Sequence, residues 1–207
     1  MNNSALSKHW DTAYETKPIE GLGWYESHPE PSLQLITKAG LNKKTLFIPG
    51  AGATVLVDQI VDSPVEIYAN DISHKALDLL SQRVGKRANL HFLAGDLRDE
   101  VTFNKLPPVD IWHDRAVFHF LTEPEERAAY IKQLDENLTS EGVVHIATFH
   151  TTGAEKCSGL PIERYDEEKM KKMFEPHFEL IDSFEHLYHT PAGAPRPYFY
   201  ATLKRKK

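Results

Sequence analysis

Short apolar runs alternate with longer segments of mixed polarity between residues 45 and 149. Apolar runs of about 4–8 residues bounded by turn residues are typical of buried strands, and the longer mixed segments between them are typical of helices. The predicted strands are residues 45–49, 66–70, 89–93, 109–113 and 142–149, and the predicted helices are residues 53–62, 74–84 and 123–138. Strands that alternate with helices in this way form a parallel, doubly wound α/β sheet with helices on both faces.

The N-terminal segment, residues 1–44, departs from this alternation. It is mostly polar with interspersed Trp and Tyr, and Pro29 and Pro31 precede a predicted helix over residues 32–39. We interpret the segment as a cap that covers the ligand-binding edge of a core formed by residues 45–207.

The pattern changes again after residue 150. A loop containing Gly and Pro, residues 151–165, precedes a predicted helix over residues 166–174. Two final apolar runs, residues 178–186 and 198–203, flank a turn-rich segment, and this arrangement predicts a β-hairpin. We expect the whole chain, residues 1–207, to form a single domain.

Size and charge restrict the classes of function. A chain of 207 residues suits one α/β domain, and a formal net charge of −6 argues against a general nucleic-acid surface. No apolar run approaches the ~20 residues of a membrane helix, and the first residues lack the apolar segment of a signal peptide. The one cysteine, Cys157, excludes an intrachain disulfide, fits a reducing compartment and is expected to be a surface-loop thiol. These features predict a soluble, cytoplasmic protein with neither nucleic acid nor membrane as a partner.

The most informative motif joins the first two predicted strands. Gly50-Ala51-Gly52 follows the first strand, and Asp71, 19 residues after Gly52, ends the second. In such a β-α-β unit the glycines let the backbone approach a ligand, and the acid can accept hydrogen bonds from both ribose hydroxyls. The third glycine of the dinucleotide fingerprint is replaced by Val55, which disfavours a pyrophosphate and favours a nucleoside without phosphate, such as S-adenosylmethionine. The alternative role of Asp71 is to cap the helix over residues 74–84, although Ser73 fits that cap better.

Four motifs together resemble the class I S-adenosylmethionine-dependent methyltransferase family, and the resemblance covers nearly the whole chain. They are the Gly50/Gly52 turn, Asn70-Asp71-Ile72-Ser73, Gly95-Asp96-Leu97 and Asp114-Arg115. The resemblance implies a Rossmann-like, doubly wound, seven-stranded sheet that is mostly parallel, with an antiparallel strand from the C-terminal hairpin. It also implies an enzyme that transfers a methyl group from S-adenosylmethionine.

The N-terminal aromatic residues narrow the resemblance. Trp10-Asp11, Tyr14 and Trp24-Tyr25 look like the opening of small-molecule thiol and thiopurine methyltransferases, and also of some protein-lysine methyltransferases of similar size. A small-molecule acceptor is therefore expected, with a protein acceptor as the alternative. One position departs from the family: Ile48 stands where an acid usually lies two residues before the first glycine. Contacts to the methionine end of the cofactor must then come from elsewhere.

The resemblance also assigns residues to the cofactor. It places Asp96 and Leu97 beside the adenine, and Asp114 and Arg115 beside the methionine moiety. The full predicted cofactor site is Trp10, Tyr14, Trp24, Gly50, Ala51, Gly52, Asp71, Ile72, Asp96, Leu97, Asp114 and Arg115. Three alternatives stay open: Asp96 belongs to an ordinary turn, Asp114 caps the following segment, and Trp10 and Tyr14 form one buried helix face.

Methyl transfer requires alignment of nucleophile, methyl group and sulfur and exclusion of water, but no metal or covalent nucleophile. His119 and His150 fall near predicted strand ends and are candidate general bases, and Tyr165 lies in the loop where substrate would enter. The 11 histidines show no spacing typical of metal ligands, so no metal site is expected.

The sequence also suggests two alternative functions. Ile48 is compatible with a nucleoside-binding protein of the same fold that has lost catalysis. Tyr165 and Lys169 have the Tyr-x-x-x-Lys spacing of short-chain nicotinamide oxidoreductases. We interpret that pair as accidental, because it follows the fifth strand and the glycine pattern differs.

Overall fold

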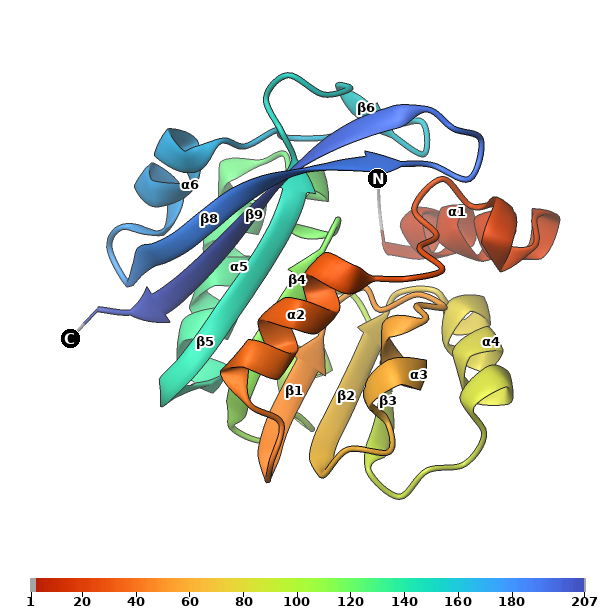
Figure 1. Cartoon of the computed structure of the whole chain (residues 1–207), viewed down its shortest axis with the longest axis horizontal. Coiled ribbons are helices and arrows are strands. Elements are labelled where there is room, and N and C mark those ends of the chain that lie inside the picture. Colours follow the sequence, from red (N-terminus) through yellow and green to blue (C-terminus); the bar gives the residue numbers. More distant parts are fainter. Residues whose placement is uncertain (1–2, 207) are drawn as a thin grey trace.

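The computed structural model describes residues 3–206, and seven of its strands form one sheet in the order β3-β2-β1-β4-β5-β9-β8 (Figure 1). The strands are β1 (Lys44–Ile48), β2 (Val65–Asp71), β3 (Leu90–Ala94), β4 (Val109–Arg115), β5 (Leu138–Phe149), β8 (Phe178–His189) and β9 (Pro195–Arg205). The α-helices are α1 (Asn3–Thr16), α2 (Glu30–Ala39), α3 (Leu56–Ile60), α4 (His74–Val84), α5 (Pro124–Asn137) and α6 (Glu167–Phe174). Three 3₁₀ turns complete the regular helical structure: η1 (Ile19–Gly21), η2 (Glu100–Phe103) and η3 (Phe118–Phe120).

The sheet confirms the predicted fold class. Strands β1 to β5 pair in parallel, whereas β9 is antiparallel to both β5 and β8. The strand order reverses between β1 and β4, because β1 pairs with β2 on one side and with β4 on the other. In open α/β sheets, ligands bind at such a reversal, beyond the carboxyl ends of the strands.

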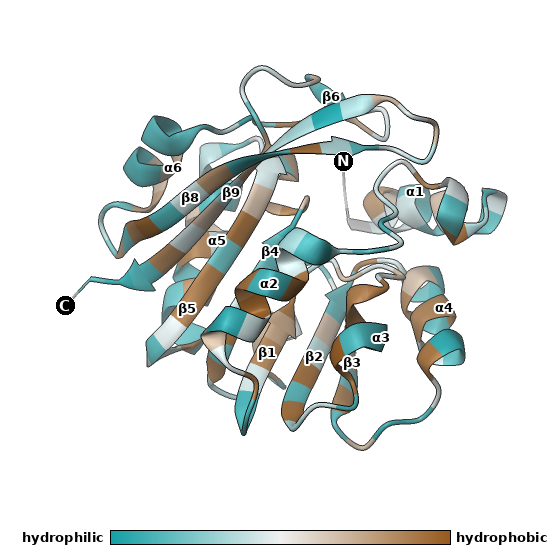
Figure 2. Ribbon diagram, viewed as in Figure 1, coloured by the Kyte–Doolittle hydropathy of each residue, from teal (hydrophilic) through white to brown (hydrophobic). Residues whose placement is uncertain are grey.

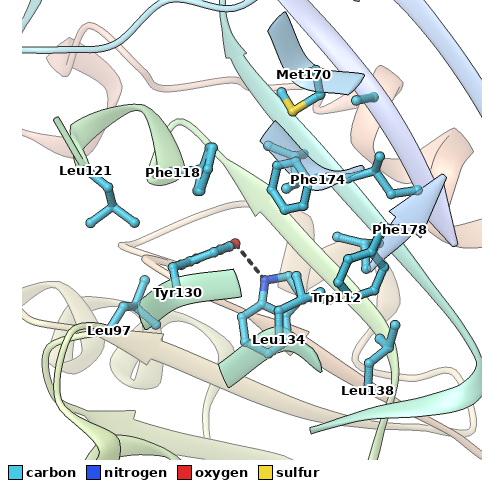
Figure 3. Packing of buried hydrophobic residues seen from close by; sticks show 14 of the residues in the cluster. Leu97, Trp112, Phe118, Leu121, Tyr130, Leu134, Leu138, Met170, Phe174 and Phe178 are labelled. Atoms are coloured by element: carbon cyan, nitrogen blue, oxygen red, sulfur yellow. Dashed lines mark hydrogen bonds between the residues drawn. The ribbon is translucent and has the colours of Figure 1, made fainter. Parts of the chain in front are cut away.

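Helices cover the two faces of the sheet and build two apolar layers. Residues of α2, α3 and α4 pack on one face around Leu46 and Ile67, whereas α5 and α6 pack on the other around Phe47 and Trp112. In Figure 2 the ribbons of β1, β2 and β5 contain many hydrophobic residues, whereas α6 is mostly hydrophilic. Figure 3 shows the second layer, in which Nε1 of the fully buried Trp112 donates a 2.8 Å hydrogen bond to Tyr130.

Local sequence accounts for the helix boundaries. Oγ of Ser73 accepts a hydrogen bond from the backbone N–H of Ala76 and caps α4, as predicted, and Gly85 ends this helix with a φ of 75°. Pro124 begins α5 behind a capping box formed by Glu123 and Glu126.

The main differences from the prediction lie at the glycine turn, in the N-terminal segment and in the loop that follows β5. Helix α3 begins at Leu56 rather than at residue 53, because the chain from Gly52 to Val55 is still in the turn. The N-terminal cap contains α1, whose Asp11 accepts hydrogen bonds from the start of α4. The loop after β5 contains a short two-stranded ribbon, β6 (Lys156–Cys157) with β7 (Leu160–Pro161). Within residues 3–206, no helix has the length and apolar character needed to cross a membrane.

Candidate functional site

A cavity of about 190 Å³ lies at the carboxyl ends of β1 to β4, under α1 and the segment that follows it. This volume is several times the ~30 Å³ occupied by one water molecule in the liquid, so the cavity is more than a packing void. Its core wall includes Ile48, Gly50, Ala51, Asp71, Ile72, Asp96, Leu97, His113, Arg115 and Val117. Its cap wall includes Leu6, Trp10, Tyr14, Leu22, Trp24, Tyr25 and Glu26.

The glycine turn is built for close approach. Gly50 and Gly52 have φ angles of 53° and 56°, in the left-handed region that favours glycine. A Cβ atom on Gly50 would lie 2.2 Å from Cγ2 of Val117, and one on Gly52 would lie 2.2 Å from the hydroxyl of Tyr14. Gly50 and Ala51 line the cavity, whereas Gly52 lies against the hydroxyl of Tyr14, which lines it.

Asp71 lies at the end of β2 with its carboxylate on the cavity wall. Oδ2 accepts a 2.7 Å hydrogen bond from the N–H of Gly52, and Oδ1 accepts a 2.8 Å bond from that of Ser73. Burial raises the pKa of Asp71 to about 6, against the lowering effect of these two N–H groups. Each carboxylate oxygen can accept a second hydrogen bond, so the side chain retains capacity for ligand hydroxyls.

Asp96 lines the cavity but is already strongly bound. The guanidinium of Arg98 donates to both of its oxygens, at 2.9 Å to Oδ1 from Nε and 2.6 Å to Oδ2 from Nη2. Arg98 also bonds Glu126 at 2.9 Å, and its N–H closes a turn on Asp96. Asp96 therefore belongs both to a turn and to the cavity wall, and Leu97 lines the cavity beside it.

Asp114 and Arg115 are adjacent in sequence but point to opposite faces of the sheet. Asp114 is fully buried and outside the cavity, and its carboxylate accepts hydrogen bonds from the N–H groups of Val117 and Phe118 and from the hydroxyl of Tyr130. This is the geometry of the capping alternative, at the start of η3. Arg115 lines the cavity, with Nε 2.9 Å from Oε2 of Glu26.

The predicted aromatic residues of the cap gather on one wall of the cavity. Ring centroids are 5.5 Å apart for Trp10 and Trp24, 5.9 Å for Tyr14 and Trp24, and 5.2 Å for Trp10 and Phe120, all edge-on. Nε1 of Trp24 donates to the hydroxyl of Tyr14 at 3.2 Å. Trp10 and Tyr14 are thus both one face of α1 and part of the cavity wall.

The three candidate catalytic residues do not line the cavity. His119 is fully buried between Phe120 and Phe149, with ring centroids 4.5 and 4.8 Å away. His150 bonds Thr152 through Nδ1 at 2.8 Å. Tyr165 is fully buried, and Nζ of Lys169 lies 5.2 Å from the centroid of its ring, so this pair is also remote from the cavity. Proximity to a strand end does not fix the direction of a side chain, and none of these three side chains is directed into the cavity.

Buried histidines predict acid sensitivity. Burial lowers the pKa of His113 and His119 to about 3 and that of His145 to about 4. In the unfolded chain the pKa of these histidines is about 6.5. As the pH falls from about 6.5 towards 4, the unfolded chain therefore binds more protons than the folded protein, and the free energy of unfolding decreases. Asp71 and Asp114, with pKa values raised to about 6, oppose this trend below pH 6 because they hold protons in the folded state.

We expect His119→Leu to flatten that acid dependence by up to about 1.4 kcal/mol per pH unit between pH 6.5 and 4. Urea denaturation at a series of pH values measures the slope. The exposed His28 gives the matched control, and His28→Leu should leave the slope unchanged. An unaltered slope in His119→Leu would mean that His119 is not buried in its neutral form.

The cavity residues that the sequence analysis did not assign to the site include Glu26, Ser32, His113 and Cys157. The period of two along a strand could have placed His113 on the same face as Arg115. The expectation of a surface thiol at Cys157 is wrong, since this side chain is 3% exposed and burial raises its pKa to about 11. Among residues 3–206, no group of three His, Cys, Asp or Glu side chains is arranged to hold a metal ion.

Solved structures share this architecture. A methyltransferase from Anabaena variabilis that depends on S-adenosylmethionine aligns with a TM-score of 0.79 and 15% identity, over 99% of this chain and 95% of its own. The fold is that of solved S-adenosylmethionine-dependent methyltransferases. Burkholderia thailandensis 1,6-didemethyltoxoflavin-N1-methyltransferase, solved with its substrate and S-adenosylhomocysteine, aligns with a TM-score of 0.74 and 16% identity, over 99% and 87% of the two chains. A glycopeptide N-methyltransferase in complex with S-adenosylmethionine aligns with a TM-score of 0.66 and 13% identity, over 89% and 97%. No protein-family model and no curated protein matches the sequence.

Proposed function

We propose that this protein is a methyltransferase that binds S-adenosylmethionine and methylates a small molecule. The observation that carries the proposal is the position of Asp71. Its carboxylate lies on the wall of a cavity at the strand-order reversal, hydrogen-bonded to the glycine turn. There it can accept hydrogen bonds from the ribose hydroxyls of a nucleoside. The cytoplasmic location expected from the sequence is part of the same proposal.

Different cavity residues would bind different parts of the cofactor. Asp71 and Ile72 would hold the ribose, and Asp96 and Leu97 would border the adenine. When bound, the cofactor supplies a methyl group activated by a sulfonium. The rings of Trp10, Tyr14 and Trp24 offer the faces on which a sulfonium cation is stabilised, by ~1–2 kcal/mol in a desolvated site. No side chain is required to form a covalent bond, so the protein contributes alignment and exclusion of water.

The closed cap favours a small acceptor. Three side chains of the core donate hydrogen bonds to backbone carbonyls of the cap: Arg196 to Gly23, Arg115 to Trp24 and Tyr188 to Tyr25. A cavity covered in this way suits an acceptor that is enclosed with the cofactor. The neighbour that acts on 1,6-didemethyltoxoflavin is named for transfer to a nitrogen of that small molecule.

Calorimetric titration tests the proposal. S-adenosylmethionine and S-adenosylhomocysteine should bind, and NAD should not. A screen with labelled cofactor over thiols, amines and proteins then identifies the acceptor. Transfer to protein lysine alone would replace the small-molecule acceptor by a protein, and binding without transfer to any acceptor would indicate a non-catalytic nucleoside-binding protein. Binding of NAD in preference to both S-adenosyl compounds would reject the proposal.

The cap should respond to the cofactor. Residues 1–30 contain few aliphatic side chains, and the three hydrogen bonds above tie residues 23–25 to the core. We expect S-adenosylhomocysteine to slow amide hydrogen exchange in residues 9–28, because rings that pack on a ligand exclude solvent from this segment. The C-terminal part of α4 serves as an internal reference that should not change.

The same idea predicts the effect of Trp24→Ala. The loss in the rate of methyl transfer, expressed as a free energy, should exceed the decrease in the free energy of unfolding. The reason is that Trp24 is only part-buried in the cap and faces the cavity. Equal protection of residues 9–28 with and without ligand, together with full activity of Trp24→Ala, would make the aromatic group ordinary core.

A further inference from the structure

The apolar residue at position 48 lies next to an unusual polar neighbour. Strand β1 pairs with β4 through Leu46 with Ile111 and Phe47 with Trp112, and the same register continued places Ile48 beside His113. Both side chains line the cavity. Ile48 is 4% exposed and can neither accept nor donate a hydrogen bond. The strand that would carry an acid in the family therefore presents only hydrocarbon, and the polar groups come from β4.

A pair of opposite charges lies on the same wall. Glu26 reaches the cavity from the cap and Arg115 from the end of β4, with Nε of Arg115 2.9 Å from Oε2 of Glu26 and side chains only 10% and 13% exposed. The guanidinium packs against two rings, 4.7 Å from the centroid of Tyr198 and 5.3 Å from that of Tyr188. A buried pair held this firmly presents one anion and one cation at fixed positions.

Several polar atoms of His113 and Arg115 have no hydrogen-bond partner within the described residues. Both ring nitrogens of the fully buried His113 and Nη2 of Arg115 are unpaired. Buried polar atoms are nearly always hydrogen-bonded in folded proteins, so unpaired atoms on a cavity wall point to a ligand that satisfies them. The required ligand group carries an acceptor for Arg115 and a donor for Glu26.

We propose that Glu26, His113 and Arg115 bind the amino-acid end of the cofactor, in place of the acid that is missing at position 48. Nη2 of Arg115 donates to the α-carboxylate, Glu26 accepts from the α-ammonium, and the neutral His113 completes the hydrogen bonding. An ion pair is complementary to a zwitterion, because each charge meets its opposite without leaving a buried charge alone. This inference rests on the proposed function, and a carboxylate of the acceptor is the competing source of the same chemistry.

Two ligands that differ only at this end test the inference. S-adenosylhomocysteine carries the amino and carboxylate groups, and 5′-methylthioadenosine has the same thioether nucleoside without them. Calorimetry should give a much higher affinity for the former in the wild-type protein. Because removal of one partner leaves the other charge buried and unpaired, the main variant is the double substitution Glu26→Gln with Arg115→Gln.

In the double variant the affinity ratio of S-adenosylhomocysteine to 5′-methylthioadenosine should fall about tenfold or more. The ratio is the readout because loss of the Arg115 hydrogen bond to the carbonyl of Trp24 loosens the cap for both ligands alike. His113→Phe should lower the ratio less. Glu126→Gln is the matched control: Glu126 also lines the cavity and pairs with an arginine, Arg98, but beside Asp96, so the ratio should stay unchanged.

The possible results separate this inference from the proposed function. Nucleoside binding with an unchanged ratio in the double variant overturns the inference and leaves the cofactor in place. Loss of methyl transfer in that variant with an unchanged ratio overturns it in favour of an acceptor carboxylate. Failure of both ligands to bind the wild-type protein overturns the inference and the proposed function together.

Discussion

Gly52→Ala is expected to lower the free energy of unfolding by about 2–5 kcal/mol and to abolish most of the affinity for S-adenosylhomocysteine. An L-residue in the left-handed conformation at φ 56° costs about 1–2 kcal/mol. The new Cβ would also lie 2.2 Å from the Tyr14 hydroxyl, and overpacking of this kind costs about 1–3 kcal/mol. Relief of the clash moves Tyr14, which lines the cavity, or moves the turn, in which case the N–H of Gly52 loses its 2.7 Å bond to Asp71.

Gly85 separates the two causes of this loss. Its φ is 75°, and nothing lies within 4 Å of the Cβ that Gly85→Ala would add. Gly85→Ala should therefore cost only the conformational part, about 1–2 kcal/mol, and leave ligand affinity unchanged. Chemical denaturation and calorimetry measure both quantities. Equal stability of the two variants would show that Tyr14 moves aside freely, and normal binding by Gly52→Ala would show that the ligand does not depend on this turn.

The elements that the sequence specified most fully were those with a local signal at each end. Helix α4 was predicted at residues 74–84 and found at His74–Val84, because Ser73 and Gly85 mark its two ends independently of the rest of the fold. Strand β5 extends back to Leu138, four residues before the predicted start at Gly142. Its first part pairs with β4 at Val109, and such pairing depends on the neighbouring strand rather than on local composition.

For the site, backbone motifs were more predictable than side-chain directions. Gly50 and Asp71 were located by spacing along the chain, and both reach the cavity. Asp114 and Arg115 are the last two residues of β4, yet only Arg115 reaches the cavity, because neighbouring residues of a strand point to opposite faces. Which face holds the cavity is a property of the whole sheet. Glu26 is harder still, since its role depends on contact with Arg115, 89 residues away in the sequence.

The buried carboxylates Asp71 and Asp114 can be compared directly by substituting each with asparagine. Each accepts hydrogen bonds from two backbone N–H groups, and burial raises the pKa of each to about 6. Only Asp71 lines the cavity. Asparagine in either place turns one accepting oxygen into a donor that faces an N–H group, so both variants should be less stable than the wild type.

Ligand binding should separate them. Asp71→Asn should weaken S-adenosylhomocysteine about 10- to 150-fold, the equivalent of about 1.5–3 kcal/mol for hydrogen bonds to a charged group, whereas Asp114→Asn should bind within about threefold of the wild type. The wild-type affinity should also decrease as the pH falls through about 6, because protonation of Asp71 removes accepting capacity, and Asp71→Asn should lack this dependence. Calorimetry at pH 5 and 8, with unfolding measured in parallel, gives all of these values. An equal loss of affinity in Asp114→Asn would restore the contact with the methionine moiety that the sequence resemblance implied, and an unchanged affinity in Asp71→Asn would remove Asp71 from the site.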